Sequence, residues 1–393
     1  MKLLNWVSVA LLAGATVGEA KPPKKPKHQK EFSNRVIFTP PKGSRASYPR
    51  VVELSDGTIL ATVSWRDPKA SKAYFPIYES KDHGWTWTHI SNVTDDVSVN
   101  GLGMWAQPAL YQLTEPFGDF PEGTVLASGN SAGDTSTNID LYASADLGYS
   151  WEFVSNVARG GRPNTTNGAD PIWEPWIMPY DGEMGIFYSD QRDPEHGQKL
   201  CHQRSTDLLE WGEVVNDVAS LNYTNRPGMT VIDYIESSGK WIFVYEFPER
   251  AGDLSYFRNN YPIYYKLANN PFDFRYSDGF PLIANESTGN GSPYIVYTSA
   301  GGPNGTLILS DADTQQVFTN NYVGRVDKWV MRQQPGRAAY SRALLIPKGN
   351  PDRLYIFSGS TFDDDPEGVQ VPFSVTALSV KKLLKNKYTL EDF

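Results

Sequence analysis

The sequence is poor in the residues from which metal centres, disulfide frameworks and nucleic-acid interfaces are built. Its one cysteine, Cys201, excludes an intrachain disulfide, and we interpret it as a small buried side chain. The five histidines form no HExxH motif and no pair at ligand spacing, so we expect no metal and no other cofactor. The net charge of −9 argues against nucleic acid and anionic membranes as partners.

Long hydrophobic runs are also missing. No apolar run reaches the roughly 20 residues that span a membrane. The apolar run Trp6–Ala13 follows a lysine near the N-terminus and precedes the small residues Gly18 and Ala20, which is typical of a secretory signal peptide. We therefore expect residues 1–20 to be removed and the protein to be secreted.

The remainder of the chain is expected to contain one folded domain. Residues 21–33 are rich in Lys and Pro, which predicts a solvated linker or pro-segment. Residues 34–393 are long enough for a single large core. Asn-X-Ser/Thr sequons, which fit a secreted glycoprotein, occur at Asn92, Asn164, Asn222, Asn285 and Asn304.

An eight-residue motif recurs along the chain at nearly constant spacing. Residues 80–87 (SKDHGWTW) return as residues 144–151 (SADLGYSW), and a degraded copy (STDLLEW) occupies residues 205–211. The offsets, 144 − 80 = 64 and 205 − 144 = 61, indicate a repeat architecture. Asp and Ser are expected to bond the backbone of a tight turn, Gly to take positive φ, and Trp to pack into a sheet. The motif resembles the Asp-box of sialidases and related glycosidases.

The pattern between the motifs predicts an all-β fold. Short β-branched and aromatic runs alternate with Asp-Gly, Gly-Asn and Pro turns. About 360 residues at a period of about 62 predict a six-bladed β-propeller of four-stranded antiparallel blades. The motif turns should join the third and fourth strands of blades one to three, and residues 35–38 should close blade six. Innermost strands are expected to begin near Pro49, Pro108, Pro175, Gly228, Pro293 and Ser341. Second strands are expected to end near Trp65, Asn130, Ser189, Glu246, Ser310 and Ser358.

Two glutamates fall at the end of the channel opposite the motif turns. Glu174 stands where the innermost strand of blade three begins, and Glu246 where the second strand of blade four ends. Aromatic and proline neighbours desolvate both, which raises a carboxyl pKa as a general acid requires. We predict that they meet as the carboxylate pair of a retaining glycosidase. Alternatively, each caps a strand or binds an arginine such as Arg66 or Arg192.

Other residues at this end are candidates for binding sugar. Asp and Arg suit sugar hydroxyls, whereas Trp and Tyr suit flat CH faces. For each of them a structural role, as an ion pair or in packing, is an equally good interpretation. Trp105, Trp173 and Tyr340 are the best candidates for a stacking wall. The full set is Arg66, Asp67, Trp105, Trp173, Tyr188, Asp190, Arg192 and Tyr340.

Two further motifs make the resemblance specific. Trp-Glu-Pro-Trp at residues 173–176 and Val-Tyr-Glu-Phe at residues 244–247, together with the Asp-boxes, resemble glycoside hydrolase family 93, the fungal exo-α-1,5-L-arabinanases. The resemblance covers essentially the whole mature chain. It implies Glu174 as acid/base and Glu246 as nucleophile.

The resemblance also implies a substrate and a product. Family members attack linear α-1,5-arabinan from the non-reducing end and release arabinobiose with retention, so arabinan and arabino-oligosaccharides are the expected partners. We expect a monomer. An exo-acting enzyme needs one end of its groove blocked, and the insertion at residues 249–261 is our candidate.

Two other functions stay open at this point. A sialidase shares the propeller and the Asp-boxes, but it needs an arginine cluster, here Arg45, Arg66 and Arg342, and its usual Phe/Tyr-Arg-Ile-Pro motif is missing. A non-catalytic carbohydrate-binding propeller would repeat its polar residues from blade to blade, whereas the residues of this face are asymmetric. Fold alone does not decide between them.

Overall fold

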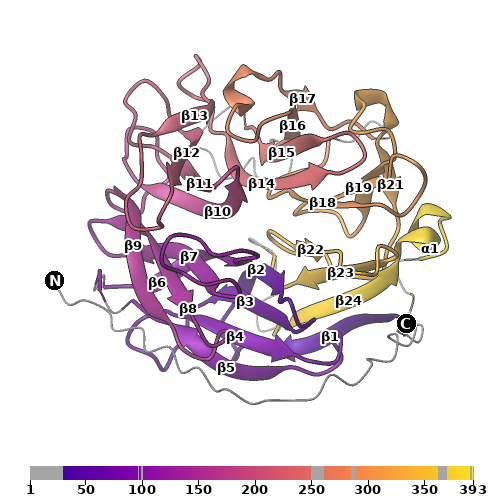
Figure 1. The fold of residues 1–393 in the computed structure, drawn as a ribbon, viewed down its shortest axis with the longest axis horizontal. Coiled ribbons are helices and arrows are strands. Elements are labelled where there is room, and N and C mark those ends of the chain that lie inside the picture. Colours follow the sequence, from indigo (N-terminus) through magenta and orange to yellow (C-terminus); the bar gives the residue numbers. More distant parts are fainter. Residues whose placement is uncertain are drawn as a thin grey trace, which may run out of the picture. The chain divides into compact units, whose positions relative to one another are not determined.

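The strands form six sheets around a central axis (Figure 1). The computed structural model describes residues 30–95, 97–98, 101–248, 261–284, 288–361, 370–389 and 392. Within these ranges each sheet has four strands, and all the pairings between them are antiparallel. The predicted all-β, six-bladed propeller is confirmed. The predicted signal peptide, residues 1–20, lies outside the described residues.

Each blade runs from an innermost to an outermost strand. Blade one is β2 (Ala46–Glu53), β3 (Ile59–Trp65), β4 (Phe75–Ser80) and β5 (Thr88–Val93). Blade two is β6 (Gly103–Gln112), β7 (Val125–Ala132), β8 (Thr137–Ser144) and β9 (Glu152–Gly160). Blade three is β10 (Ile172–Tyr180), β11 (Glu183–Asp190), β12 (Lys199–Ser205) and β13 (Val215–Val218).

The second half of the ring follows the same order. Blade four is β14 (Gly228–Ile235), β15 (Lys240–Glu246), β16 (Ile263–Ala268) and β17 (Phe280–Pro281). Blade five is β18 (Tyr294–Thr298), β19 (Thr306–Ser310), β20 (Val317–Asn320) and β21 (Val330–Arg332). Blade six is β22 (Ala343–Leu345), β23 (Arg353–Ser358), β24 (Phe373–Ser379) and β1 (Phe32–Phe38). The short helices are η2 (Phe274–Tyr276), η3 (Val326–Lys328) and α1 (Val380–Leu384).

The ring is closed by strands from the two ends of the chain. β1 pairs with β24, so the predicted closure of blade six is confirmed, although β1 begins at Phe32, inside the segment expected to be linker. The helix α1 follows β24 directly. No helix among the described residues has the length and apolar character needed to cross a membrane.

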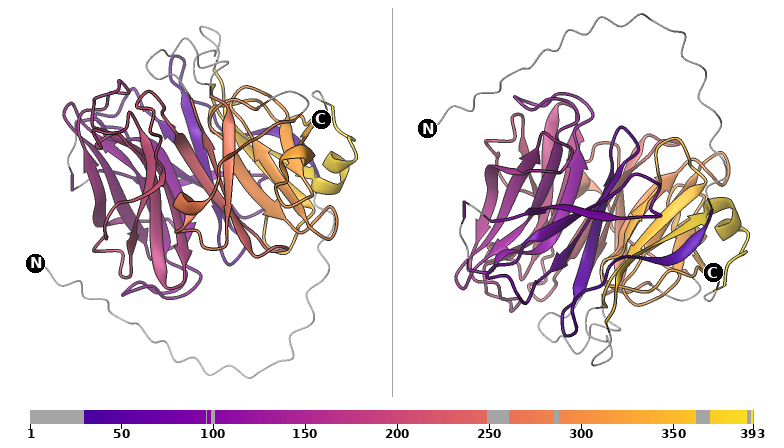
Figure 2. Two further views of the ribbon diagram at one scale, coloured as in Figure 1. Left: turned by 90° about the horizontal axis from the view of Figure 1, so that it is seen from above. Right: turned by 90° about the horizontal axis from the view of Figure 1, so that it is seen from below.

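The hydrophobic core lies between neighbouring blades. Leu60 and Phe75 of blade one pack with Met104 and Tyr142 of blade two, all four of them buried. Gly129 in β7 makes this approach possible, because a Cβ there would lie 2.2 Å from the Phe75 ring. Blades held together in this way fix the strand ends around the axis. In Figure 2 the strands run between the two ends of the channel, so the loops gather at one end or the other.

The repeated motifs form turns between the third and fourth strands of their blades. Gly84 has φ of 85°, and its buried N–H donates to Ser80 Oγ at 2.9 Å. The carboxylate of Asp82 accepts from the backbone N–H of Thr86 at 2.8 Å, and the Trp87 indole donates to the Gly84 carbonyl at 3.1 Å. These bonds satisfy the backbone of the turn and fasten it to the sheet.

Candidate active site

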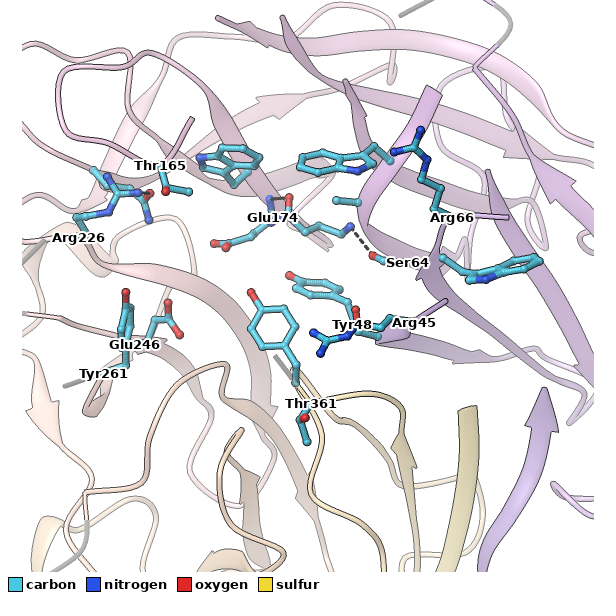
Figure 3. Close-up of a pocket in the computed structure, with 18 of the residues that line it drawn as sticks. Arg45, Tyr48, Ser64, Arg66, Thr165, Glu174, Arg226, Glu246, Tyr261 and Thr361 are labelled. Carbon is cyan, nitrogen blue, oxygen red and sulfur yellow. Dashed lines mark hydrogen bonds between the residues drawn. The ribbon is translucent and has the colours of Figure 1, made fainter. Parts of the chain in front are cut away.

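A pocket of about 590 Å³ opens at the end of the channel away from the motif turns (Figure 3). Its walls come mainly from residues at or near the starts of innermost strands and the ends of second strands, as expected from the topology. Blades one, two, three, four and six contribute to it. Both predicted catalytic residues, Glu174 and Glu246, line it.

The same backbone irregularity stands at or just before the innermost strand of each blade. A non-glycine residue takes positive φ there, and register shifts mark β-bulges at this point in β2, β6, β10 and β14. A bulge re-aims a side chain, and strain of this kind gathers at functional sites. Tyr48, Gln107 and Glu174 use it to face the pocket. The six positive-φ residues, with φ from 37° to 65°, are Tyr48, Gln107, Glu174, Met229, Ser292 and Ser341.

Glu174 is fixed through both its backbone and its carboxylate. Its N–H donates to Gln107 Oε1 at 3.1 Å. Its Oε2 accepts from Ser189 Oγ at 2.6 Å and from the Met229 N–H at 2.8 Å. Burial raises the pKa of Glu174, although these two donors and the Arg226 guanidinium act against the rise.

Glu246 ends β15 and is 8% exposed. Its Oε2 accepts from the Ser292 N–H at 2.7 Å. Burial, followed by repulsion from Glu174, raises the pKa of Glu246 to about 8. Because the two carboxyl groups repel each other, the pair titrates as a unit and keeps a proton near neutral pH.

The two carboxylates meet over Gly228. Oε2 of Glu174 and Oε1 of Glu246 lie 3.3 Å and 3.4 Å from the point where a Cβ on Gly228 would stand. These oxygens are therefore within about 7 Å of each other, a range that includes the roughly 5–5.5 Å of retaining glycosidases. The structure thus brings the two glutamates together as the sequence predicted.

Several solved structures are similar to this chain in sequence and fold. A scan against protein-family models and a search of curated proteins both find no match. The α-L-arabinofuranosidase of Fusarium graminearum, a family 93 glycoside hydrolase solved with arabinobiose, is 38% identical with a TM-score of 0.84. The match covers 90% of this chain and 99% of that one. The chain belongs to glycoside hydrolase family 93.

Two further solved structures are similar to this chain, one over its sequence and fold and the other in its fold. The α-L-arabinanase of Penicillium chrysogenum, also solved with arabinobiose, is 37% identical with a TM-score of 0.83, and the match covers 90% and 100% of the two chains. A sialidase of Streptococcus pneumoniae is 10% identical with a TM-score of 0.56, and covers 90% of this chain and 71% of its own. That second likeness shows the fold alone.

Four of the eight candidate sugar-binding residues line the pocket of the family 93 enzyme. They are Arg66, Trp105, Trp173 and Tyr340. The Trp105 and Trp173 rings stand 6.4 Å apart, tilted by 52°, and the Trp173 indole donates to Gln191 at 2.9 Å. Trp105, Trp173 and Tyr340, the three residues predicted to form a stacking wall, all line the pocket together with Glu174.

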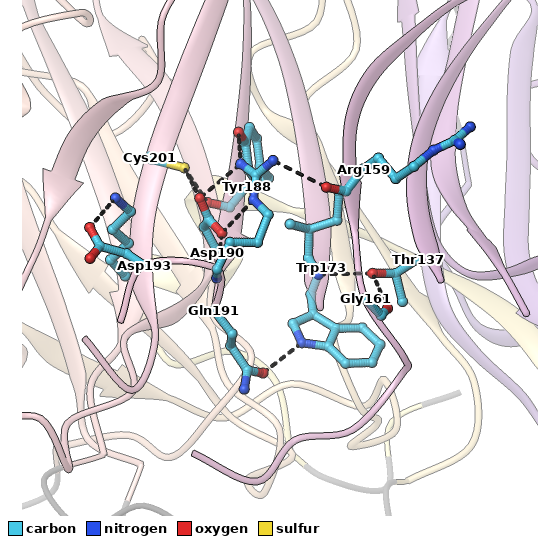
Figure 4. Close-up of polar contacts among 12 residues, drawn as sticks. Thr137, Arg159, Gly161, Trp173, Tyr188, Asp190, Gln191, Asp193 and Cys201 are labelled. Carbon is cyan, nitrogen blue, oxygen red and sulfur yellow. Dashed lines mark hydrogen bonds and ion pairs between the residues drawn. The ribbon is translucent and has the colours of Figure 1, made fainter. Parts of the chain in front are cut away.

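Tyr188, Asp190 and Arg192 do not line the pocket. Arg192 donates to Asp190 Oδ1 at 2.8 Å and to the Tyr188 hydroxyl at 2.8 Å, inside blade three (Figure 4). Successive side chains of a strand point to opposite faces. Ser189 reaches Glu174, so its neighbours in β11 face away from the carboxylates. The fixed ion pair, which was the alternative interpretation, is the arrangement found.

Asp67 lies beside the pocket rather than in it. It lines an adjoining depression that shares Arg45 and Arg66 with the pocket. Its carboxylate accepts from the Lys69 N–H at 2.9 Å and from the Tyr74 hydroxyl at 3.0 Å. These bonds shape the loop after β3, so a direct role in binding sugar has no geometric support.

Arg226 is a pocket residue that was not among the predicted site residues. This residue is 9% exposed and lines the pocket, and its guanidinium donates to Gln191, Gln198 and Asn167 at 2.8–2.9 Å. It lies near both glutamates and opposes the rise in their pKa values. A signal was present, because Arg226 lies two residues before the innermost strand of blade four, just as Trp105 and Trp173 lie near the bulges of their own innermost strands.

Two further expectations concern the rim of the pocket. Of the proposed groove-blocking segment, only Tyr261 belongs to the described residues, and it lines the pocket beside Glu246 (Figure 3). The arginine cluster of a sialidase does not form from the expected residues. Arg342 is fully buried, donates to the Asp311 carbonyl at 3.1 Å and does not line the pocket, whereas Arg45 and Arg66 do.

One group of side chains within the described ranges has the spacing of metal ligands. Asp193, Glu195 and His196 lie together outside the pocket. Lys199 pairs with Asp193 at 2.7 Å, and His196 Nδ1 contacts the Ser220 carbonyl at 2.7 Å. These contacts already engage two of the three residues, so the group carries no assignment as a metal site.

Proposed function

We propose that this enzyme hydrolyses linear α-1,5-L-arabinan from the non-reducing end and releases arabinobiose with retention, as a secreted monomer. Membership of family 93 and the arabinobiose bound by its relatives support the choice of sugar. The single observation that carries hydrolysis is the convergence of the half-buried Glu174 and the buried Glu246 carboxylates over Gly228.

In the proposed mechanism Glu174 protonates the departing glycosidic oxygen while Glu246 attacks the anomeric carbon. The carbon–oxygen bond breaks, and a covalent glycosyl-enzyme forms on Glu246. Glu174, now ionised, takes a proton from water, which attacks the same carbon and releases Glu246. The step requires one protonated and one ionised carboxyl group, and mutual repulsion in the buried pair supports that state.

Without substrate, the surroundings of the two carboxyl groups favour the reverse assignment, with Glu174 ionised and Glu246 protonated. Glu174 receives two hydrogen bonds at one oxygen, whereas the pKa of Glu246 is raised to about 8. The proton belongs to the pair, and positive charge that develops at the anomeric carbon favours the ionised form of the attacking group. This shift on binding is part of the proposal.

Azide rescue assigns the roles. With an aryl α-arabinobioside, Glu174→Ala plus azide should give the α-azide, because the glycosyl-enzyme still forms. Glu246→Ala plus azide should give the β-azide by direct attack. The reverse pattern would exchange the two roles and leave the carboxylate pair in place.

Product analysis on linear α-1,5-arabinan tests the function itself, with a sialoside as control. Arabinobiose should be the early sole product, α-configured by NMR, and both alanine variants should lose it. Mixed longer products would overturn the exo mode. No release from arabinan would overturn the proposal, and sialoside cleavage would then favour the sialidase alternative. Mass spectrometry and light scattering of the secreted protein test removal of residues 1–20 and the monomer.

A further inference from the structure

Three polar side chains that line the pocket lie close to one glycine, Gly228. Gly228 is the first residue of β14. A Cβ there would lie 3.0 Å from Gln198 Nε2, 3.3 Å from Glu174 Oε2 and 3.4 Å from Glu246 Oε1. The φ of Gly228 is outside the positive range that itself favours glycine. The crowded space above the residue, rather than its backbone conformation, therefore accounts for glycine here.

None of the three neighbours is loosely held. The Gln198 amide is fixed at both ends, because Nε2 donates to the Pro227 carbonyl and Oε1 accepts from Arg226, each at 2.8 Å. Glu174 uses the oxygen that faces Gly228 to accept its two hydrogen bonds. Glu246 is fixed through its other oxygen by a backbone N–H. A methyl group on Gly228 would have to displace Gln198 and Glu174 by tenths of an ångström and would stand in van der Waals contact with Glu246.

We propose that Gly228 is a positioning residue that, by lacking a side chain, keeps open the gap between the carboxylates in which the anomeric carbon and the departing oxygen lie. This inference rests on the proposed function. A methyl group would narrow the gap, displace the Glu174 carboxylate and press against that of Glu246. A misplacement of about 1 Å at a reacting centre can cost 10²-fold in rate, so a displacement of tenths of an ångström should cost about tenfold. The loss should therefore fall on kcat rather than on binding of the rest of the sugar.

The test compares Gly228→Ala with Gly101→Ala, another glycine outside the positive φ range, whose added Cβ would meet nothing within 4 Å. On linear arabinan we expect kcat of Gly228→Ala to fall about tenfold, with KM within about threefold of wild type. The acidic limb of its pH–rate profile should move to higher pH, because the methyl group excludes water from both carboxylates. Gly101→Ala should match wild type in all three.

Gln198 is the closest contact of the added methyl group. The effect of displacing Gln198 on kcat must therefore be separated from the effect of displacing the carboxylates. The double variant Gln198→Ala/Gly228→Ala removes that contact, and Gln198→Ala alone completes the cycle. The proposal predicts that the double variant stays as slow as the less active single variant. Recovery of kcat would assign the loss to Gln198 and overturn the proposal.

Two other outcomes would also overturn it. One is an active Gly228→Ala enzyme with wild-type kcat, which would leave arabinan hydrolysis intact. The other is a lowered Tm with an unmoved pH profile, as expected for Gly129→Ala, whose methyl group would collide with Phe75, a residue that does not line the pocket. Failure of the proposed function is distinct, because then wild type itself releases nothing from arabinan.

Discussion

The two ends of the propeller both rest on repeats, but they use repetition differently. At the motif-turn end the same hydrogen bond recurs, from a backbone N–H to a side-chain oxygen at the end of the third strand. At the pocket end only the positive-φ backbone recurs, and its side chains differ from blade to blade. Stability can use a repeated side chain, whereas one active site needs blades that differ. The recurrent bonds of the first end are Gly84 to Ser80, Gly148 to Ser144, Leu208 to Ser205 and Gly324 to Asn320.

Glu246 occupies a strand position that recurs from blade to blade. Strand register makes it equivalent to Ser64, Asn130 and Ser189, because each of them pairs with the residue directly before the positive-φ residue of its own blade. Ser64 accepts from the Gln107 N–H of the next blade at 2.8 Å, and Glu246 accepts from a backbone N–H of its own next blade in the same way. Its longer side chain leaves the second oxygen facing the gap.

The largest effect is expected when each pocket glutamate is replaced by the residue that stands at the equivalent position of another blade. Glu246→Ser restores the residue of blades one and three, and Glu174→Gln that of blade two. Both proteins should fold, because the inter-blade acceptor survives, whereas kcat on arabinan should fall about 10⁴-fold or more. Steady-state kinetics and Tm check this. Activity within tenfold of wild type would remove the variant residue from the catalytic pair.

The next effect is on the pH dependence of stability. The pKa of Glu246 rises from its ordinary value of 4.5 to about 8 on folding, mainly through burial. The folded state holds this proton more tightly, so wild type should lose stability as pH rises from about 4.5 to 8. Glu246→Gln removes the titration and should gain a few kcal/mol over wild type across that window.

Urea unfolding at pH 5 and pH 8 measures this difference. Glu152→Gln, on the exposed start of β9, is the control and should parallel wild type. If the free energies of unfolding of Glu246→Gln and wild type change equally between pH 5 and pH 8, ionisation of the buried Glu246 carboxyl group does not destabilise the folded protein.

The sequence was sufficient for the six blades because their signals are local. Turn residues and Pro punctuate every strand, and the strand ends expected at Trp65, Glu246, Ser310 and Ser358 are those found. The turn of blade five was missed, since Asn320 replaces the serine of the motif and its Oδ1 accepts from the Gly324 N–H at 3.1 Å. A different side chain makes the same bond there.

The site was predicted less completely, because its geometry depends on register. Tyr188 and Asp190 flank a strand end at the correct end of the channel, but alternation directs only Ser189 to Glu174. Gly228 carries no local signal, since its importance lies in the atoms above it, which come from other strands and loops. Contacts between blades of this kind follow from the assembled fold and not from a pattern along the chain.

Arg192→Met tests whether the network inside blade three belongs to the structure or to the pocket. The variant leaves the buried Asp190 carboxylate without its guanidinium, which is expected to cost about 1–3 kcal/mol in the free energy of unfolding. Kinetics on arabinan should stay within twofold of wild type, because the network does not line the pocket. A tenfold rise in KM would restore Arg192 as a sugar-binding residue.

Trp105→Ala should show the converse, a binding effect with little change in stability. Trp105 is only half-buried and faces the pocket beside Trp173. Loss of stacking on a sugar face should weaken arabinobiose binding about tenfold, or roughly 1.4 kcal/mol, with a smaller change in kcat. Calorimetric titration with arabinobiose measures it. Unchanged affinity would place the sugar elsewhere in the pocket.

Ser80→Ala is expected to have the smallest effect, and it sharpens the contrast between the two ends. The substitution removes the acceptor of the buried Gly84 N–H and a hydrogen bond at 3.0 Å to Asp82. Three other turns keep the same bond, so one loss should cost about 1 kcal/mol, visible in urea unfolding. kcat and KM should not change, because this turn lies at the opposite end of the channel from Glu174 and Glu246. A kinetic effect would mean that the motif turns position the pocket through the blade, and that the two ends are coupled.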